Sequence, residues 1–231
     1  MKIFKWMVAI LLICEVQALA LAETSYFVTE GTKNNSKIAL TFDDGPGHYT
    51  TKILDILDQY NIKATFFMNG DQVKIRPKIA QEVLKRGHEI ADHTYSHMNF
   101  YAYEKKQGLT KTQEKIDSEI ELSRAEIKKV TGQEPVLCRM PYGYHRNWMD
   151  TTAKKFNITF VNWTFGEDWT KIPKEKMAKD YVDNVHAGAI LLLHDGGKNR
   201  QKTVDILPQI IAQAKKKNLT FSTIGELLRA E

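Results

Sequence analysis

The sequence of 231 residues is poor in cysteine, glycine and proline, with 2 Cys, 13 Gly and 6 Pro. Two cysteines exclude a small protein built on disulfides and a zinc module that needs several cysteines. Few glycines and prolines, together with 42% hydrophobic and 26% charged residues, exclude a collagen-like or disordered chain. The net charge of +5 comes from scattered lysines rather than a dense basic stripe, so we expect no nucleic-acid partner. Of the classes of protein considered, the composition leaves a folded globular protein.

Long apolar runs are also scarce, and the one that stands out covers residues 6–14. Lys2 and Lys5 precede it, and residues 20–22 supply the small side chains of a signal-peptidase site. Polar residues interrupt the run before it reaches the ~20 apolar residues of a spanning helix. We therefore predict that residues 1–22 are a cleaved signal peptide. The mature chain is expected to be an exported monomer of the cell envelope, periplasmic or extracellular, without a stable membrane anchor.

Beyond residue 22, short apolar runs alternate with longer amphipathic segments. The apolar runs predict strands at residues 37–42, 64–68, 136–138, 158–163, 189–193 and 219–221. The amphipathic segments predict helices at residues 51–60, 77–86, 110–130, 148–156, 174–186 and 203–217. This alternation favours an α/β fold with a largely parallel sheet, either a barrel or a doubly wound sheet. Since no linker divides the chain, we expect a lead-in at residues 23–36 and one domain at residues 37–231.

Two clusters of polar residues follow predicted strands or short apolar runs. Asp43 and Asp44 come at the end of the first strand, where side chains of a parallel α/β fold perform chemistry. His93 and His97 are four residues apart, so on a helical turn they would share one side and converge on one ion. Two imidazoles and one carboxylate suit a divalent transition metal with open positions for water and substrate. Thr94 stands where the zinc metalloprotease pattern has glutamate, which disfavours that class.

Three more segments carry polar residues after predicted strands. Arg139 follows a short apolar run, and its guanidinium could bind a carboxylate at the same rim. The segment 167–169 reads Glu-Asp-Trp, and His194 ends a hydrophobic strand. Each feature alone is typical of a salt bridge, a surface acid or a core histidine. Their joint occurrence in one strand-helix alternation favours a functional site.

Taken together, the segments TFDDGP, HTYSH, RMPY, EDW and LLLHD resemble the five motifs of the polysaccharide deacetylases of carbohydrate esterase family 4, which carry the NodB-type domain. The motifs occur in the family's order, and the resemblance covers residues 37–228. It implies that the α/β fold is a distorted, incomplete (β/α) barrel. It also implies that the chain is a metal-dependent hydrolase that deacetylates a polysaccharide.

The resemblance implies a metal site and a general base. Asp44, His93 and His97 would hold one divalent metal, most often zinc, with cobalt as a possible substitute. Asp43 would be the general base, and Arg139 would orient it. This assignment agrees with the residue types, since a metal lowers the pKa of water and a carboxylate beside it can take the proton.

The resemblance also implies an acid and a substrate pocket. His194 would be the general acid, because an imidazole can deliver a proton to a departing amine, and Asp168 would tune it. Trp169 and Leu192 would line the pocket for the acetyl methyl. Tyr142 would contact the substrate, and a backbone N–H near it would help bind the reacting oxygen.

The fourth motif departs from the family pattern, which commonly reads Asp-x-x-Asp-Trp. Phe165 stands in place of the first aspartate, while Asp168 is retained. The support of the surrounding loop is therefore open, and Glu167 is one candidate for it.

The substrate most favoured by the sequence is an N-acetylglucosamine-containing polysaccharide, and export favours peptidoglycan. The alternatives are chitooligosaccharides and, on the same site, O-acetyl groups of xylan. A catalytically silent glycan-binding module is disfavoured by the intact set of metal and base residues.

Overall fold

The computed structural model describes residues 26–33 and 36–229. The predicted signal peptide lies outside the described residues, so it stays a prediction. Among the described residues, no helix is both long and apolar enough to cross a membrane.

An eight-stranded parallel sheet forms the centre of the molecule. Its strands follow the order β1-β6-β5-β4-β3-β2-β7, and β8 pairs with the start of β2. Their bounds are β1 Phe27–Val28, β2 Lys37–Gly45, β3 Thr65–Met68, β4 Glu89–Asp92, β5 Leu137–Cys138, β6 Thr159–Val161, β7 Ile190–His194 and β8 Thr220–Phe221. All these pairings are parallel, so the carboxyl ends of the strands meet at one rim of the sheet.

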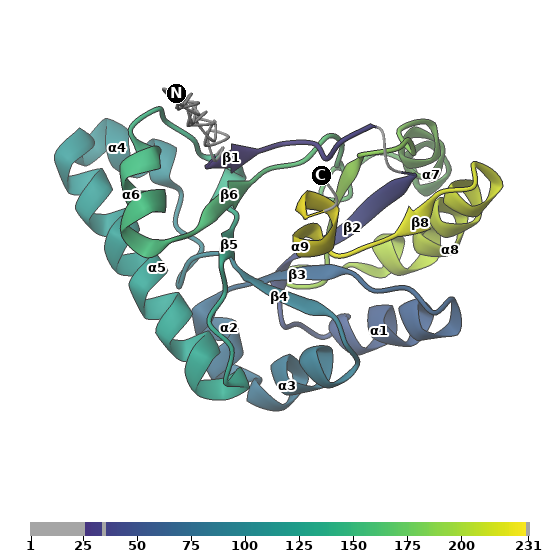
Figure 1. Ribbon diagram of the computed structural model, residues 1–231, viewed down its shortest axis with the longest axis horizontal. Coiled ribbons are helices and arrows are strands. Elements are labelled where there is room, and N and C mark those ends of the chain that lie inside the picture. The colour runs from purple at the N-terminus through teal and green to yellow at the C-terminus, as the bar shows by residue number, and fades with distance from the viewer. Residues whose placement is uncertain (1–25, 34–35, 230–231) are drawn as a thin grey trace, which may run out of the picture.

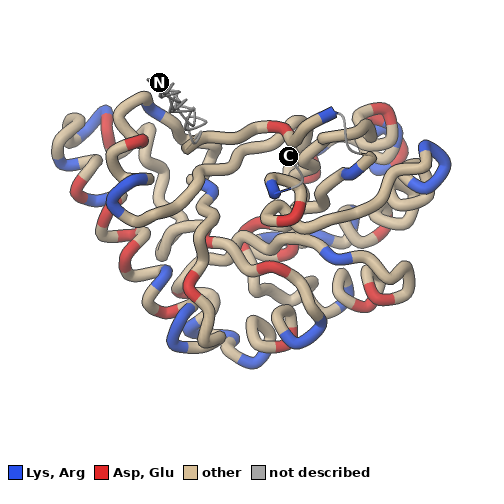
Figure 2. Tube along the Cα trace, in the orientation of Figure 1, with Lys and Arg blue, Asp and Glu red and all other residues tan. Residues whose placement is uncertain are grey.

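The helices surround the curled sheet, as Figure 1 shows. They are α1 Thr50–Gln59, α2 Gly70–Ile75, α3 Pro77–Lys85, α4 Phe100–Gln107, α5 Leu109–Thr131, α6 Met149–Phe156, α7 Lys174–Asp183, α8 Gln201–Lys216 and α9 Ile224–Leu228, with a short 3-10 helix at Pro141–Gly143. Basic and acidic residues are interspersed along these helices (Figure 2), as expected for a solvated outer face. Connections through helices explain why the strands are parallel.

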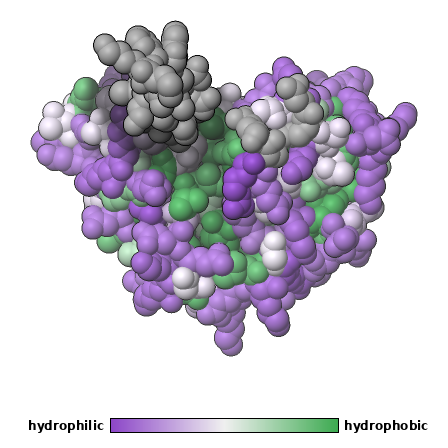
Figure 3. Space-filling view, viewed as in Figure 1, coloured by the Kyte–Doolittle hydropathy of each residue, from purple (hydrophilic) through white to green (hydrophobic). Residues whose placement is uncertain are grey.

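The strands are buried on both faces, which requires nearly continuous apolar sequence. In β2, Ile38, Leu40 and Phe42 pack outward with the apolar sides of the helices. Ala39 points the other way and joins a second cluster inside the barrel. That inner cluster also contains Phe67, Ala91, Leu137, Val161 and Ile190 from the neighbouring strands, and Ile224 and Leu227 from α9. Figure 3 shows the molecule from the same side as Figure 1. Hydrophobic side chains gather in the middle of the visible surface, surrounded by hydrophilic ones.

The barrel is incomplete, as the family resemblance implies. Among the described residues, no strand pairing joins β7 to β1 at the two edges. The chain that follows β6 approaches β7 instead, through one isolated bridge between Phe165 and Leu191. The N–H groups of Thr164 and Leu192 donate to the carbonyls of Ile190 and Phe165 in this bridge, at 2.9 and 2.8 Å.

All six predicted strands and all six predicted helices are present, with ends shifted by a few residues. The sequence did not predict β4, which has only two apolar residues, or the short elements β1, α2, α4 and α9. β1 falls within the predicted lead-in and pairs with β6, so this segment contributes to the sheet.

Candidate active site

All ten predicted site residues lie at the carboxyl rim of the sheet, on or after β2, β4, β5, β6 and β7. Eight of them line one cavity of about 530 Å³: Asp43, Asp44, His93, His97, Tyr142, Trp169, Leu192 and His194. The other two, Arg139 and Asp168, are buried and contact Asp43 and His194 from behind. The fold thus brings together residues that are up to 151 positions apart, because parallel strands end at the same rim.

The end of β2 carries two adjacent carboxylates that both approach His93 but otherwise have different partners. Its pairing with β3 is irregular between Asp43 and Gly45, and Asp44 has a positive φ of 70°. A positive φ is uncommon for residues other than glycine, although aspartate tolerates it better than most. Gly196 makes this turn possible, since a Cβ there would lie 1.8 Å from the carbonyl oxygen of Asp44.

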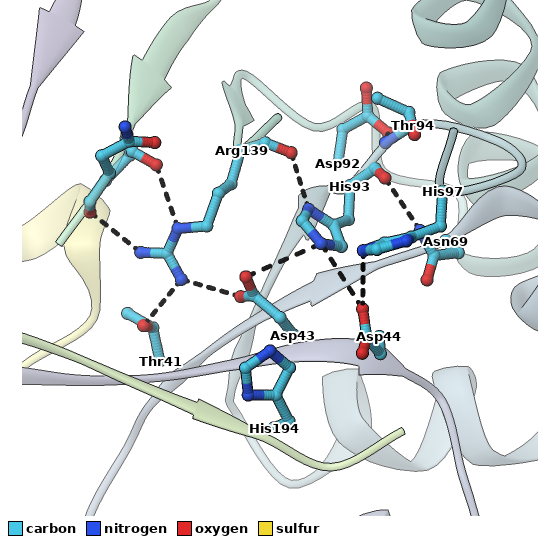
Figure 4. Close-up of polar contacts among 12 residues, drawn as sticks. Thr41, Asp43, Asp44, Asn69, Asp92, His93, Thr94, His97, Arg139 and His194 are labelled. Carbon is cyan, nitrogen blue, oxygen red and sulfur yellow. Dashed lines mark hydrogen bonds and ion pairs between the residues drawn. The ribbon is translucent and has the colours of Figure 1, made fainter. Parts of the chain in front are cut away.

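Asp44 faces the two histidines (Figure 4). Its Oδ1 lies 3.1 Å from Nε2 of His97 and 3.6 Å from Nε2 of His93. His93 Nδ1 contacts the carbonyl oxygen of Arg139 at 2.6 Å, and a carbonyl can only accept, so Nδ1 carries the proton. In the neutral ring, the lone pair of Nε2 therefore points toward Asp44, as a metal ligand requires.

These three residues fit a divalent cation. Their ligand atoms lie within 4.8 Å of one another, and the set of one carboxylate and two imidazoles suits a transition metal. Oδ1 of Asp44 is buried and accepts no hydrogen bond from any described residue. Burial raises the pKa of the Asp44 carboxyl, but its interactions with the protonated forms of His93 and His97 outweigh burial and hold the pKa well below its usual range. Asp44 is therefore ionised, which a metal ligand must be.

The segment from His93 to His97 is a loop and not the helical turn that the sequence predicts. Thr94 and His97 have positive φ values of 65° and 53°, which a helix excludes. The Thr94 N–H donates to Asp92 Oδ1 at 2.9 Å, and the Thr94 carbonyl accepts from Gly70 N–H in the first turn of α2. These contacts compete with helical hydrogen bonds. The two imidazoles converge nevertheless, because the loop is held at both ends.

Neighbouring buried side chains hold this loop in place. Asn69 donates from its amide to the carbonyl of His93 at 2.8 Å, and its own N–H donates to the carbonyl of Gly45. Glu119 of α5 accepts from the N–H and the hydroxyl of Ser96, at 2.7 and 2.9 Å. The metal-facing loop is thereby tied to both β2 and α5.

Asp43 contacts a buried arginine. Arg139 Nη1 lies 2.7 Å from Asp43 Oδ1, and the guanidinium is fully buried over the ring of Phe67. Burial lowers the pKa of Arg139, while Asp43 opposes that change. Further donors reach Thr41 Oγ1 at 2.8 Å and the carbonyls of Val161 and Asn162, each at 3.0 Å. Since a guanidinium with several fixed partners has little freedom, Arg139 fixes the orientation of Asp43.

His194 lines the cavity and contacts a buried carboxylate behind it. Its Nδ1 lies 2.6 Å from Oδ1 of Asp168, and its backbone N–H donates to Oδ2 at 2.9 Å. Burial lowers the pKa of His194, but the charge and hydrogen bond of Asp168, with smaller contributions from Asp43 and Asp44, raise it overall. Trp169, about half exposed, lies edge-on to the imidazole with ring centroids 5.4 Å apart.

Tyr142 and Leu192 complete the cavity. Tyr142 has a positive φ of 59° and a ring 5.1 Å from that of His97, and 59% of the residue is exposed. Leu192 is buried in β7 and closes the floor beside His194. The cavity therefore has an aromatic entrance, an apolar floor and three histidines along its walls.

The loop that lacks the first aspartate of the fourth motif is supported by a residue that the sequence did not indicate. Tyr181 of α7 is fully buried, and its hydroxyl donates to the carbonyl of Leu192 at 2.6 Å. The same oxygen accepts from the N–H groups of Glu167 and Asp168, at 3.0 and 3.3 Å. The ring of Phe165 packs edge-on against Tyr181. A lone tyrosine in an amphipathic helix gave no signal of this role.

The sequence profile of the polysaccharide deacetylase family matches residues 30–161, more than half of the chain. A peptidoglycan-N-acetylglucosamine deacetylase of Bacillus cereus is 38% identical over 213 residues, which cover 90% of this chain and 96% of the relative. The chain belongs to the polysaccharide deacetylase family. Members of this family are metal-dependent hydrolases, and Asp44, His93 and His97 form a possible metal site in this deacetylase.

Two further comparisons bear on the fold and on the substrate. The crystal structure of a peptidoglycan N-acetylglucosamine deacetylase superposes with a TM-score of 0.81 at 30% identity, covering 90% of this chain and 95% of that one. A bifunctional xylanase/deacetylase of Pseudobutyrivibrio xylanivorans is 35% identical over 85% of this chain and 31% of its own length. The predictions of a polysaccharide deacetylase and of a distorted α/β barrel are confirmed.

Proposed function

We propose that this deacetylase removes the N-acetyl group from N-acetylglucosamine units of peptidoglycan in the cell envelope, acting as an exported monomer with one bound Zn²⁺. The observation that carries the proposal is the arrangement of three groups around one cavity. These are the metal ligands, the Arg139–Asp43 pair and the Asp168–His194 pair. Amide hydrolysis needs all three, because the carbonyl must be polarised, water must be activated and the amine must be protonated.

Asp44, His93 and His97 would hold the zinc ion, which polarises the acetyl carbonyl and lowers the pKa of water when it is bound. Asp43 takes a proton from the attacking water. Its Oδ2 is the oxygen that Arg139 leaves free, since the guanidinium contacts Oδ1. An oxygen–carbon bond forms as that proton moves to the carboxylate.

His194 then supplies a proton to the amide nitrogen as the carbon–nitrogen bond breaks. Nδ1 is engaged by Asp168, so Nε2 is the nitrogen that can donate to the substrate. The products are acetate and a glucosamine unit. The backbone N–H of Tyr142 is the proposed donor to the reacting oxygen, and Trp169 and Leu192 are the proposed contacts of the acetyl methyl.

The choice of peptidoglycan rests on the similar relatives and on the predicted signal peptide. The Bacillus cereus relative, which matches this chain over nearly its full length, is a peptidoglycan deacetylase. The O-acetyl alternative is favoured by one observation, the similarity to the xylanase/deacetylase. An ester needs the same polarisation of the carbonyl, but its leaving group needs less help from an acid.

A substrate comparison tests the proposal. Acetate release is measured with the metal-loaded enzyme on peptidoglycan, N-acetylglucosamine oligomers and acetylated xylan, each with and without a chelator. We expect chelator-sensitive release that is fastest from peptidoglycan. Faster release from xylan would establish the ester alternative, and faster release from the oligomers would establish a chitooligosaccharide deacetylase. No release from any of the three would contradict an enzymatic function.

A further inference from the structure

The helix α8 begins beside the acid pair and contributes a side chain to it. Thr203, in the first turn of α8, is fully buried. Its hydroxyl lies 2.6 Å from Oδ2 of Asp168. An ionised carboxylate only accepts hydrogen bonds, and a threonine side chain has a single proton to donate. The direction of this hydrogen bond is therefore fixed, from Thr203 to Asp168.

With this hydrogen bond, both oxygens of Asp168 are engaged. Oδ1 faces Nδ1 of His194, and Oδ2 accepts from the backbone N–H of His194 and from Thr203. Among the side chains that the structure describes, Thr203 and His194 are the ones that bind this carboxylate. The N–H of His194 belongs to the same residue that Asp168 orients. Thr203 is thus the contact that ties the pair to a different element of the fold.

We propose that Thr203 is a positioning residue for the deacetylation reaction. It fixes Asp168 so that the carboxylate holds His194 in the orientation from which Nε2 protonates the departing amine. This inference rests on the proposed roles of His194 and Asp168. It extends the acid pair to a chain of three residues, Thr203, Asp168 and His194, contributed by α8, the loop after β6 and β7.

The inference predicts different effects on amide and ester substrates. An amide cannot release its amine without a proton, whereas an activated aryl acetate releases a stable phenolate with little help. Loss of the Thr203 hydroxyl should therefore slow amide hydrolysis much more than ester hydrolysis. A threonine that only fills space at the start of α8 would affect both substrates alike.

The experiment compares Thr203→Val, which keeps the shape but removes the hydroxyl, with Thr203→Ser, which keeps the hydroxyl. Thr203→Ala serves as a smaller variant without the hydroxyl if the valine variant does not fold. Thr112→Val is the matched control, because Thr112 is fully buried in α5 and donates to the carbonyl of Gly108, away from the cavity. Each full-length, metal-loaded protein is assayed on an N-acetylglucosamine oligomer and on an aryl acetate, and its metal content is measured.

We expect Thr203→Val to lower kcat on the amide by about tenfold, within the range for a hydrogen bond to a charged group. The loss on the aryl acetate should be much smaller, metal content should not change, and Thr203→Ser should retain the wild-type ratio of the two rates. The control Thr112→Val should also keep that ratio.

Equal losses on both substrates, or a serine variant as impaired as the valine variant, would overturn the inference. An unchanged rate ratio in Thr203→Val, combined with a selective amide loss in His194→Ala, would overturn the role of Thr203 alone. Equal losses on both substrates in His194→Ala would instead contradict the proposed function.

Discussion

At the scale of single residues, the site depends on two adjacent carboxylates with different environments. Asp43 is 2% exposed and contacts Arg139, while Asp44 faces His93 and His97. Both carboxylates approach Nε2 of His93, at 3.7 and 3.6 Å, but of the two it is Asp44 that also approaches His97, at 3.1 Å. The two residues therefore cannot replace each other, although both are aspartates at the end of one strand.

The first prediction separates the proposed base from the proposed metal ligand. Asp43→Asn should keep bound metal but lose roughly 10²–10⁴-fold in kcat, the usual contribution of a general base. Asp44→Asn should lose metal affinity, because an amide is a much weaker ligand than a carboxylate. Metal content by elemental analysis and acetate release on the same samples check both. Metal loss in Asp43→Asn with retention in Asp44→Asn would reverse the two roles.

The second prediction concerns the pH dependence of His194. Asp168, Asp43 and Asp44 raise its pKa against the effect of burial. A general acid acts in its protonated form, so kcat should fall as the pH rises through this raised pKa. Asp168→Asn removes the nearest negative charge, lowers the pKa and should move the alkaline limb of kcat to lower pH.

The control for this pH profile is Asp150→Asn, an exposed acid in α6 that does not line the cavity. It should leave the alkaline limb in place. If Asp168→Asn left the limb unchanged or moved it to higher pH, Asp168 would not set the pKa of His194.

The site residues that belong to the five motifs could be located from the sequence. The side chains that hold them in place could not. Thr41, Tyr181 and Thr203 each bind a site residue through one hydroxyl. Buried threonine and tyrosine are common in strands and helices, so their residue type carries little information. Their roles appear only when the fold places them beside Arg139 or Asp168.

At the scale of elements, the long periodic segments were predictable and the short ones were not. The helix α5 has 23 residues and a clear 3.6-residue periodicity, with Ile116, Ile120 and Ile127 buried. By contrast, β4 reads Glu-Ile-Ala-Asp, which has too few apolar residues to indicate a strand. Its position between β3 and β5 makes it a strand, through pairing rather than through propensity.

The third prediction tests the support of the loop between β6 and α7. Tyr181→Phe leaves the carbonyl of Leu192 and the N–H groups of Glu167 and Asp168 without the hydroxyl that they share. Buried polar groups without partners cost about 1–3 kcal/mol each in stability, so the free energy of unfolding should fall by at least that amount. Urea unfolding measures the change, and metal content should be retained.

Tyr144→Phe is the matched control for that measurement. Tyr144 is also buried, but its hydroxyl donates to Glu104, which remains paired with Arg146. Its loss should therefore cost less stability than the loss of the Tyr181 hydroxyl. If Tyr181→Phe were no less stable than Tyr144→Phe, the loop would not depend on this hydroxyl.

At the scale of the whole molecule, the curled parallel sheet assembles the site. The alternation of strands and helices predicts a parallel sheet, and the resemblance predicts an incomplete barrel. The way the barrel closes could not be predicted, because β1 has only two residues and the contact between Phe165 and Leu191 is a single bridge. Neither leaves a periodic signal in the sequence.

The packing of the inner cluster also could not be predicted from the sequence. Ala39, Phe67 and Ile190 fill the barrel interior together with Ile224 and Leu227 of α9. A helix of five residues is too short to predict from periodicity, although its capping box at Thr223 and Glu226 is a recognisable start signal. Which end of the barrel it covers follows only from the packing.

The central claim is that this deacetylase acts through a metal held by Asp44, His93 and His97. The most direct test removes the metal with a chelator and measures acetate release from N-acetylated glycan before and after Zn²⁺ or Co²⁺ is returned. We expect activity to disappear and to return with either ion, while His97→Ala neither binds metal nor regains activity. His186→Ala, which changes a partly exposed histidine paired with Glu30, should behave as the unaltered protein does. Full activity in a metal-free preparation would contradict the account.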